Sequence, residues 1–243
     1  MVRIGISGVC GRMGRRILHI VQAGKDARAT VGLEREGHPD VGKCIDGLGV
    51  SSDITKIREC DCLIEFTTPQ VTTEHLKAVI EFKKAVVIGT TGLTQQQQDE
   101  VKEAARQVPV VYAPNMSVGV NLLFELVRAA AEILKNYAVS VEEAHHIHKK
   151  DAPSGTAKKI AEILNREGFK LPIEDIKAVR EDEIVGDHRV VFESSTDKLE
   201  LFHSAKTRDI FAEGAVRAGC WVVSKPAGLY SMRDVLCEGS RKQ

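Results

Sequence analysis

The fold of this chain is decided by its N-terminal stretch, Val2-Arg-Ile-Gly-Ile-Ser-Gly-Val-Cys-Gly-Arg-Met-Gly14. The first six residues have the apolar, branched character of a short strand, and three glycines then lead into a segment with helical periodicity. A second strand-like run, 29–34, ends on an acid 20 positions after Gly14. This order of strand, glycine turn, helix, strand and acid is typical of a dinucleotide-binding fold, in which the pyrophosphate lies against the helix N-terminus.

The glycine turn and the acid leave the choice of dinucleotide open. The glycine spacing is GxxGxxG rather than the commoner GxGxxG, so the position of the motif between two strands carries the prediction. The structural alternative is that these residues form an ordinary turn between a strand and a helix and bind no ligand. Glu34 predicts a hydrogen bond to the ribose 2′-hydroxyl of NAD, whereas Arg35 can pair with the 2′-phosphate of NADP. NADH and NADPH are therefore both candidate cofactors.

Three further strand-like runs follow in the first half of the chain, at 62–66, 85–88 and 109–113, and helical segments alternate with them. Alternation of this kind predicts a parallel sheet. Ligands bind at the carboxyl ends of parallel strands, so we expect a ligand-binding edge directly after these runs. The segments at that edge are polar or rich in glycine: Thr67-Thr-Pro69, Gly89-Thr-Thr-Gly92 and Pro114-Asn-Met116.

The second half of the chain has a different pattern. A helix and a strand are followed by a second helix at 156–164, and then by strand-like runs without intervening helices at 176–179, 189–192 and 198–202. A hairpin turn fits between the last two runs. Clustered strands of this kind predict a second sheet that is mixed or antiparallel.

We therefore predict an α/β protein of two domains. An N-terminal dinucleotide-binding domain with a Rossmann-like parallel sheet spans 1–116 and is completed by a returning helical segment within 209–243. A second domain of α+β type, built on the mixed or antiparallel sheet, spans 117–208. The polar tail after Glu238 is expected to be frayed.

Composition excludes several classes of function. Lys and Arg together number 34, as do Asp and Glu, so the formal net charge is zero at pH 7. Without a basic excess we expect no nucleic-acid or membrane-surface partner. No apolar run approaches the ~20 residues of a membrane span. The six cysteines are scattered and the chain opens on a strand-like pattern, so we expect reduced thiols and a cytoplasmic protein.

Three of the eight histidines fall within one stretch, Glu143-Ala-His-His-Ile-His-Lys-Lys-Asp-Ala-Pro-Ser-Gly-Thr-Ala157. A helix begins near its end, with Ser154 as the expected N-cap and Gly155 giving a ligand access to the main chain. The free N–H groups of a helix N-terminus favour an anion. We therefore predict a site for a small, multiply anionic molecule that gains or loses a proton. A solvated loop is the structural alternative.

The histidines also allow a prediction about their directions. If 142–148 forms a strand, His146 and His148 share one face and His145 points to the other. No metal site is predicted here, because no cysteine or carboxylate stands at a convincing ligand spacing nearby.

The chain resembles the 4-hydroxy-tetrahydrodipicolinate reductases, also called dihydrodipicolinate reductases, over nearly its whole length. The stretch Glu143–Lys149 followed by Asp151-Ala-Pro-Ser-Gly-Thr156 is highly specific to that family, whereas the glycine turn is shared with many dehydrogenases. The other matching segments are Gly8–Gly14, Phe66–Pro69, Gly89–Gly92, Ala113–Asn121 and Gly228–Val235.

The resemblance implies a reaction and its catalytic residues. The reaction is the NADH- or NADPH-dependent reduction of (2S,4S)-4-hydroxy-2,3,4,5-tetrahydrodipicolinate to 2,3,4,5-tetrahydrodipicolinate, with loss of water, on the diaminopimelate route to lysine. His145 would be the general acid that protonates the ring carbon next to the one that receives hydride, and Lys149 would be the second catalytic residue. His146, Gly155 and Thr156 would bind the substrate, the last two through their backbone amides.

The resemblance also implies cofactor contacts and an assembly. Residues 117–208 would serve substrate binding and oligomerisation, because members are homotetramers built through the sheets of this domain. Met116 stands where many members carry phenylalanine, and Cys10 occupies a variable position of the turn. The cofactor positions are Gly8, Val9, Cys10, Gly11, Arg12, Met13, Glu34, Arg35, Gly89, Thr90, Thr91, Ala113, Pro114, Asn115 and Met116.

Two other functions stay open on the sequence alone. One is a related dehydrogenase of the same fold that acts on another cyclic imine or dicarboxylate; the combination of the histidine stretch with Ser-Gly-Thr argues against it. The other is a regulatory nucleotide-binding protein that has kept the fold and lost the chemistry. The intact pair of His145 and Lys149 argues against this second function.

Overall fold

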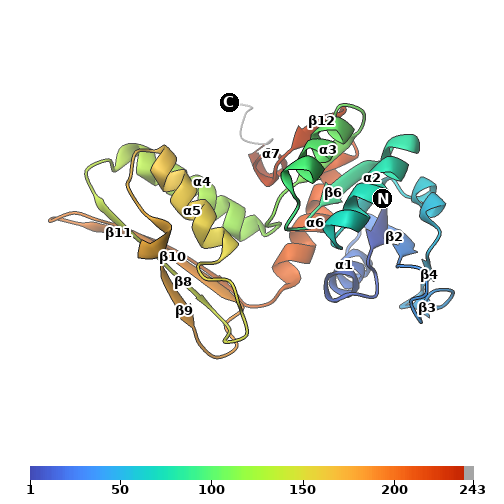
Figure 1. Ribbon diagram of the computed structural model, residues 1–243, viewed down its shortest axis with the longest axis horizontal. Coiled ribbons are helices and arrows are strands. Elements are labelled where there is room, and N and C mark those ends of the chain that lie inside the picture. The colour runs from blue at the N-terminus through green and yellow to red at the C-terminus, as the bar shows by residue number, and fades with distance from the viewer. Residues whose placement is uncertain (238–243) are drawn as a thin grey trace. The chain divides into compact units, whose positions relative to one another are not determined.

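The computed structural model describes residues 1–237 as two compact units (Figure 1). The first unit joins residues Met1–Ser117 to the segment that begins at Phe211, and the second unit is Val118–Ile210. Each unit has its own buried apolar core. Within the described residues, no helix is both long and apolar enough to cross a bilayer.

The first unit is built on eight strands: β1 (Val2–Ser7), β2 (Ala27–Leu33), β3 (Cys44–Ile45), β4 (Leu48–Ser51), β5 (Cys62–Glu65), β6 (Ala85–Ile88), β7 (Pro109–Tyr112) and β12 (Gly228–Tyr230). They form one sheet in the order β12-β7-β6-β5-β1-β2-β4-β3. Every pair is parallel except β3 with β4. Every residue of β5 and β6 is buried, which fits the apolar character of both strands apart from Glu65 at the end of β5. The predicted parallel sheet is confirmed.

The helices of the first unit are α1 (Arg12–Ala23), α2 (Pro69–Glu81), α3 (Gln95–Ala105), α6 (Asp209–Val222) and α7 (Met232–Cys237), with a 3-10 turn at Ile54–Glu59. α2 begins at the N-cap Thr68, and α3 begins with a capping box formed by Thr94 and Gln97. α6 lies against the sheet, where a Cβ at Gly219 would be 3.2 Å from Ile4. Small residues on α6 thus allow the close contact.

Four elements of this unit were not predicted: β3, β4, β12 and α7. Each strand among them has only two to four residues, which is too short to display a periodic pattern. β3 and β4 are joined by Asp46 and Gly47, which have φ of 47° and 79°. An Asp-Gly pair of this kind is the hairpin signal that the sequence did contain. The tail that was expected to be frayed lies outside the described residues.

The second unit is built on four strands: β8 (Ala138–His145), β9 (Lys177–Arg180), β10 (Gly186–Glu193) and β11 (Lys198–Ala205). Their order is β11-β10-β8-β9, with β8 and β9 parallel and the other pairs antiparallel. The helices α4 (Val118–Ile133) and α5 (Gly155–Arg166) run side by side along this sheet (Figure 1), and a 3-10 turn lies at Ile173–Asp175. The predicted mixed sheet and its hairpin are confirmed.

Candidate active site

The glycine turn after β1 leaves a helix N-terminus open to an anion. Gly8 has a φ of +66°, and a Cβ at Gly14 would lie 2.2 Å from the Gly8 carbonyl oxygen, so a side chain there would overlap the turn. Gly11 is the N-cap of α1 and gives no side-chain cap, and the first turn of α1 carries no acid. The residues present therefore fit a pyrophosphate held by backbone N–H groups.

Glu34 lies beside this turn, directly after β2. Its carboxylate accepts hydrogen bonds from the backbone N–H groups of Cys10 (3.3 Å) and Arg35 (3.0 Å). The structure thus brings Glu34 and Arg35 together with the turn of Gly8 to Met13. Burial, and then the charge of Glu34, raise the pKa of the Cys10 thiol.

The segments after β5 and β6 are bonded to each other. The backbone N–H of Thr67 donates to the hydroxyl of Thr90 (3.2 Å), and the Thr72 hydroxyl donates to the same oxygen (2.9 Å). A Cβ at Gly89 would lie 2.2 Å from the ring of Phe66, so only glycine fits there. Gly89 and Thr90 are therefore held at the carboxyl edge of the sheet, followed by the exposed Thr91.

The segment after β7 contains a different kind of position. Ala113 and Met116 are 5% and 1% exposed and belong to the core of the first unit. Pro114 is exposed, and the Asn115 side-chain oxygen accepts from the Ser117 N–H (2.9 Å). Ala113 and Met116 therefore expose little of either side chain or backbone, and Pro114 is the exposed residue of this segment.

A buried polar network that the sequence did not predict lies at the same edge of the sheet. Glu65, 1% exposed, accepts from the Thr67 hydroxyl and lies 2.7 Å from Nδ1 of His75. The Ser7 hydroxyl lies 3.0 Å from the same nitrogen. The signal was a lone acid at the end of an otherwise apolar strand, which is uncommon unless the acid is paired.

The histidine stretch of the second unit begins at the end of β8. His145 is the last residue of that strand, so the run 142–148 is not one strand. His146 and His148 lie after it, at and within a turn, and their ring centroids are 6.2 Å apart. The Ile184 carbonyl, just before β10, accepts from the His146 N–H (2.7 Å).

Glu143 is the centre of a buried network beneath His145. The two residues share a face of β8 because they are two positions apart. The fully buried Glu143 carboxylate accepts from Nδ1 of His145, from two nitrogens of Arg180 (3.0 and 2.7 Å) and from the Ser154 backbone N–H (3.1 Å). Burial raises the pKa of Glu143, but the hydrogen bonds from Arg180 and His145 outweigh it and the net shift is downward. Glu143 is therefore ionised.

An ionised Glu143 fixes the tautomer of His145. A carboxylate only accepts, so Nδ1 of His145 carries the proton that it donates. The other nitrogen, Nε2, faces Gly186, where a Cβ would lie 3.0 Å away. Burial lowers the pKa of His145, and the hydrogen bond to Glu143 offsets part of that effect. In this arrangement Nε2 is the nitrogen through which His145 can exchange a proton.

His188 supports this arrangement from β10. Its ring meets His145 edge-on at 5.3 Å, and its Nε2 lies 3.2 Å from the Ser154 hydroxyl. Burial, helped by the nearby His145, lowers the pKa of His188 to about 3. His188 is therefore neutral near pH 7 and adds no charge to the site.

The N-terminus of α5 is the second part of this site. Ser154 is its N-cap, as predicted, and accepts from the Ala157 N–H (3.2 Å). Gly155 is exposed, with no protein atom within 4 Å of a built Cβ, and Thr156 is half-buried. Lys149 bonds to Asp151 (2.7 Å) in the loop between β8 and α5. One loop and two element ends thus hold all five residues predicted for catalysis and substrate binding.

Glu143, Arg180 and His188 are the members of this network for which the sequence gave no role. The alternation of a strand is enough to place Glu143 beside His145. Arg180 and His188 arrive on β9 and β10, opposite His145 and Glu143 respectively. That pairing depends on sheet register, which a single sequence does not display.

Comparisons with known proteins agree with this fold and identify a family. The family models for the N-terminus and the C-terminus of dihydrodipicolinate reductase match residues 2–116 and 119–236. The 4-hydroxy-tetrahydrodipicolinate reductases of Geotalea daltonii and Geobacter metallireducens are each 41% identical to this chain, over 97% of it and 99% of their own length. A dipicolinate-bound dihydrodipicolinate reductase from Paenisporosarcina sp. TG-14 has the same fold, with a TM-score of 0.80 at 23% identity, over 95% of this chain and 97% of that one.

The fold and the sites together define an oxidoreductase of the class that uses a nicotinamide dinucleotide. The matches over both units make the class specific. The chain belongs to the dihydrodipicolinate reductase family.

Proposed function

We propose that this protein reduces (2S,4S)-4-hydroxy-2,3,4,5-tetrahydrodipicolinate to 2,3,4,5-tetrahydrodipicolinate, with loss of water, on the diaminopimelate route to lysine. The observation that carries the proposal is the buried Glu143, which bonds both His145 and the backbone of the α5 N-cap. One carboxylate thereby links a proton donor to an anion-binding helix end. A small dicarboxylate that must be protonated requires this combination.

His145 is proposed as the general acid. With Nδ1 engaged by Glu143, Nε2 carries the proton that is delivered to the ring carbon next to the hydride acceptor. A bound dianion raises the pKa of a neighbouring histidine, which counters the effect of burial when substrate is present. His145 is thus charged when its proton is needed.

The substrate carboxylates are proposed to bind at Lys149 and at the α5 N-terminus. The Gly155 and Thr156 amides lie in the first turn, where the helix dipole favours an anion. Lys149 supplies a positive charge from a side chain that is 22% exposed. Nδ1 of His146 is buried without a hydrogen-bond partner among the described residues, and it is proposed to bind the substrate.

A reduced nicotinamide dinucleotide supplies the hydride. We propose that the first unit holds it, through the positions Gly8–Met13, Glu34, Arg35, Gly89–Thr91 and Ala113–Met116, and that the second unit holds the substrate. NADH and NADPH are both proposed to serve, because Glu34 suits a ribose hydroxyl and the exposed Arg35 suits a 2′-phosphate. A homotetramer in the cytoplasm is proposed, with exposed apolar side chains such as Phe202 on β11 (59% exposed) at the contacts.

The proposal is tested by mixing the protein with NADH or NADPH and the cyclised product of pyruvate and aspartate semialdehyde. We expect the absorbance of the reduced nicotinamide to fall, and to fall only when both the protein and the cyclised substrate are present. Nucleotide binding without any consumption would contradict the proposal and favour a regulatory protein. Consumption only with a different cyclic imine would favour a related dehydrogenase.

A further inference from the structure

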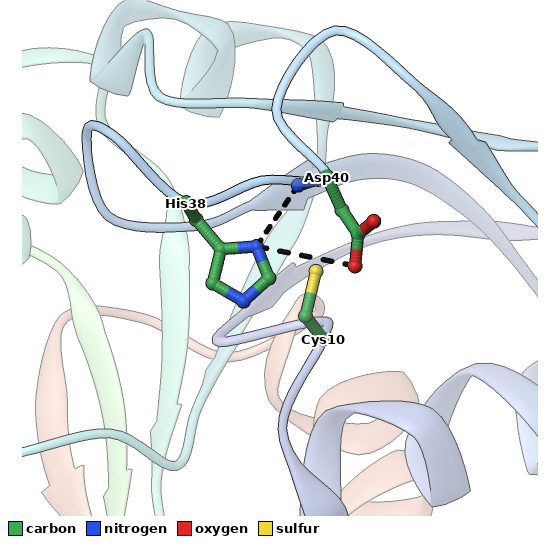
Figure 2. Close-up of side chains that lie close together, drawn as sticks. All are labelled: Cys10, His38 and Asp40. Atoms are coloured by element: carbon green, nitrogen blue, oxygen red, sulfur yellow. Dashed lines mark hydrogen bonds and ion pairs between the residues drawn. The ribbon is translucent and has the colours of Figure 1, made fainter.

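Three side chains with different donor atoms converge beside the glycine turn of the first unit (Figure 2). Cys10 comes from the turn itself, and His38 and Asp40 come from the segment that follows β2. The Cys10 sulfur, a ring nitrogen of His38 and a carboxylate oxygen of Asp40 all lie within 4.8 Å of one another. All three residues are half-buried, so the cluster is neither a solvated surface group nor part of the core.

We propose that Cys10, His38 and Asp40 form a binding site for a thiophilic divalent metal ion, with Zn²⁺ as the best fit. Sulfur, imidazole nitrogen and carboxylate oxygen are the three ligand types that Zn²⁺ takes from proteins. Ions that bind only hard oxygen ligands, such as Mg²⁺ and Ca²⁺, are disfavoured by the sulfur. Three protein ligands leave the fourth tetrahedral position for water.

The spacing of the donor atoms is close to what a tetrahedral ion requires. Ligand atoms bound to Zn²⁺ at about 2.0–2.3 Å lie about 3.3–3.8 Å apart. Nδ1 of His38 is 4.0 Å from a carboxylate oxygen of Asp40. Side-chain rotations that move the atoms by about 1 Å therefore close the site around an ion, with no change in the fold.

The hydrogen bonds of His38 direct the correct nitrogen into the cluster. The backbone N–H of Asp40 donates to Nδ1 (3.2 Å), so Nδ1 is unprotonated in the neutral ring. The same nitrogen faces the Asp40 carboxylate (Figure 2). Coordination at Nδ1 thus replaces one backbone hydrogen bond and requires no change of tautomer.

Two cations lie near Asp40 and must give way to the ion. Lys43 is 3.4 Å and Arg15 is 4.0 Å from its carboxylate oxygens, and their side chains are 62% and 46% exposed. Exposed ion pairs of this kind contribute little, whereas a metal bond to a carboxylate replaces them directly. The Cys10 thiol is protonated in the metal-free protein, so binding releases a proton.

The site has a consequence that rests on the proposed function. Cys10 lies in the turn proposed for the pyrophosphate, and its N–H bonds to Glu34, which is proposed for the ribose. An ion held at the Cys10 sulfur would lie beside both of these groups. We therefore expect Zn²⁺ and the nucleotide to exclude each other.

Titration with Co²⁺ tests the site without any enzyme assay. Tetrahedral Co²⁺ bound to a thiolate has a near-ultraviolet charge-transfer band and intense visible bands. We expect these bands at one equivalent in the wild type, and displacement of the Co²⁺ by Zn²⁺. Cys10→Ser should abolish the charge-transfer band, and His38→Gln and Asp40→Asn should each weaken binding by about tenfold or more.

Cys44→Ser is the matched control, because Cys44 is an exposed cysteine outside the cluster. It should keep the bands unchanged. Absence of a thiolate band in the wild type, or an unchanged band in Cys10→Ser, would overturn the proposal. Circular dichroism of each variant separates loss of ligand from loss of fold.

Addition of NADH to the cobalt-loaded protein tests the consequence separately. Loss of the bands in step with nucleotide binding supports mutual exclusion. Bands that persist while nucleotide binds would overturn the exclusion and leave the metal site standing. Failure of the metal-free protein to bind any nucleotide would contradict the proposed function and not the metal site.

Discussion

At the scale of single residues, the protonation of His145 determines the pH dependence of the proposed reaction. A general acid works in its protonated form, and burial lowers the pKa of His145. We therefore expect kcat/KM to be full at low pH and to fall as pH rises through a pKa below ~6.5, the usual histidine value. The limb of kcat should lie at higher pH, because bound substrate raises this pKa. A kcat/KM that is flat or rising through this range would argue against an acid at His145.

Glu143 is expected to act as a positioning residue for His145. Glu143→Gln removes the charge that fixes Nδ1–H and stabilises the imidazolium, so kcat should fall by about 10²–10⁴-fold while KM changes little. The pH limb should also move to lower pH. Glu142→Gln, on the other face of β8, is the control and should behave as wild type. Equal changes in both variants would show that Glu143 has only a structural role.

Lys149 is expected to bind a substrate carboxylate. Calorimetric titration with pyridine-2,6-dicarboxylate should show weaker binding in Lys149→Ala by about tenfold, which is the effect of losing one charge-assisted hydrogen bond. Lys150→Ala, the exposed neighbour, should bind as the wild type does. Equal binding of this dicarboxylate by both variants would contradict a role for Lys149 in substrate binding.

Some of these residues could be predicted from the sequence, and others could not. The histidines, Lys149 and Ser154 stand in one contiguous stretch, and the N-cap role of Ser154 followed from its place before a helical pattern. Arg180 and His188 reach the site only through strand pairing. Met116 was predicted to contact the cofactor. In the structure it is only 1% exposed, and the type of a residue does not predict burial of this extent.

At the scale of elements, the α5 N-terminus both stabilises the fold and forms part of the site. Ser154→Ala removes the cap and the His188 contact, and should lower the free energy of unfolding by about 1 kcal/mol. Thr94→Ala in α3 removes a comparable cap in the other unit. Both variants should lose stability in denaturant titrations, but only Ser154→Ala should also bind pyridine-2,6-dicarboxylate more weakly. If Ser154→Ala and Thr94→Ala bound the dicarboxylate equally well, the α5 N-terminus would not be part of the substrate site.

The predictability of the elements follows from their length and regularity. β1, β6, α3 and α5 were placed within a few residues, because each has an apolar run or a clear cap. β3 has only two residues, and the short β4 and β12 each contain a glycine, so none of the three displays a continuous apolar run. β8 ends at His145, and the next N–H, of His146, bonds to Ile184, a partner far along the sequence that could not be predicted.

At the scale of the whole molecule, each unit carries one half of the proposed chemistry. The glycine turn and Glu34 lie on the parallel sheet of the first unit, and the Glu143 network lies on the mixed sheet of the second. The alternation of strands and helices predicted the parallel sheet, and the clustered strands without intervening helices predicted the mixed one. Because the two proposed binding sites lie in different units, a change at His145 should leave the nucleotide site in the other unit intact.

The most direct test compares the wild type with His145→Gln in two measurements on the same samples: kcat with the cyclised substrate, and the Kd of NADH by calorimetry. We expect kcat of His145→Gln to be lower than that of the wild type by about 10²–10⁴-fold, while the Kd of NADH stays within about twofold. The control variant is His148→Gln, because His148 lies in the exposed turn that follows β8. Asn165→Ala is unsuitable as a control, because it removes two hydrogen bonds to Leu171. Unchanged kcat in His145→Gln, or an equal loss of nucleotide binding, would contradict the assignment of the acid.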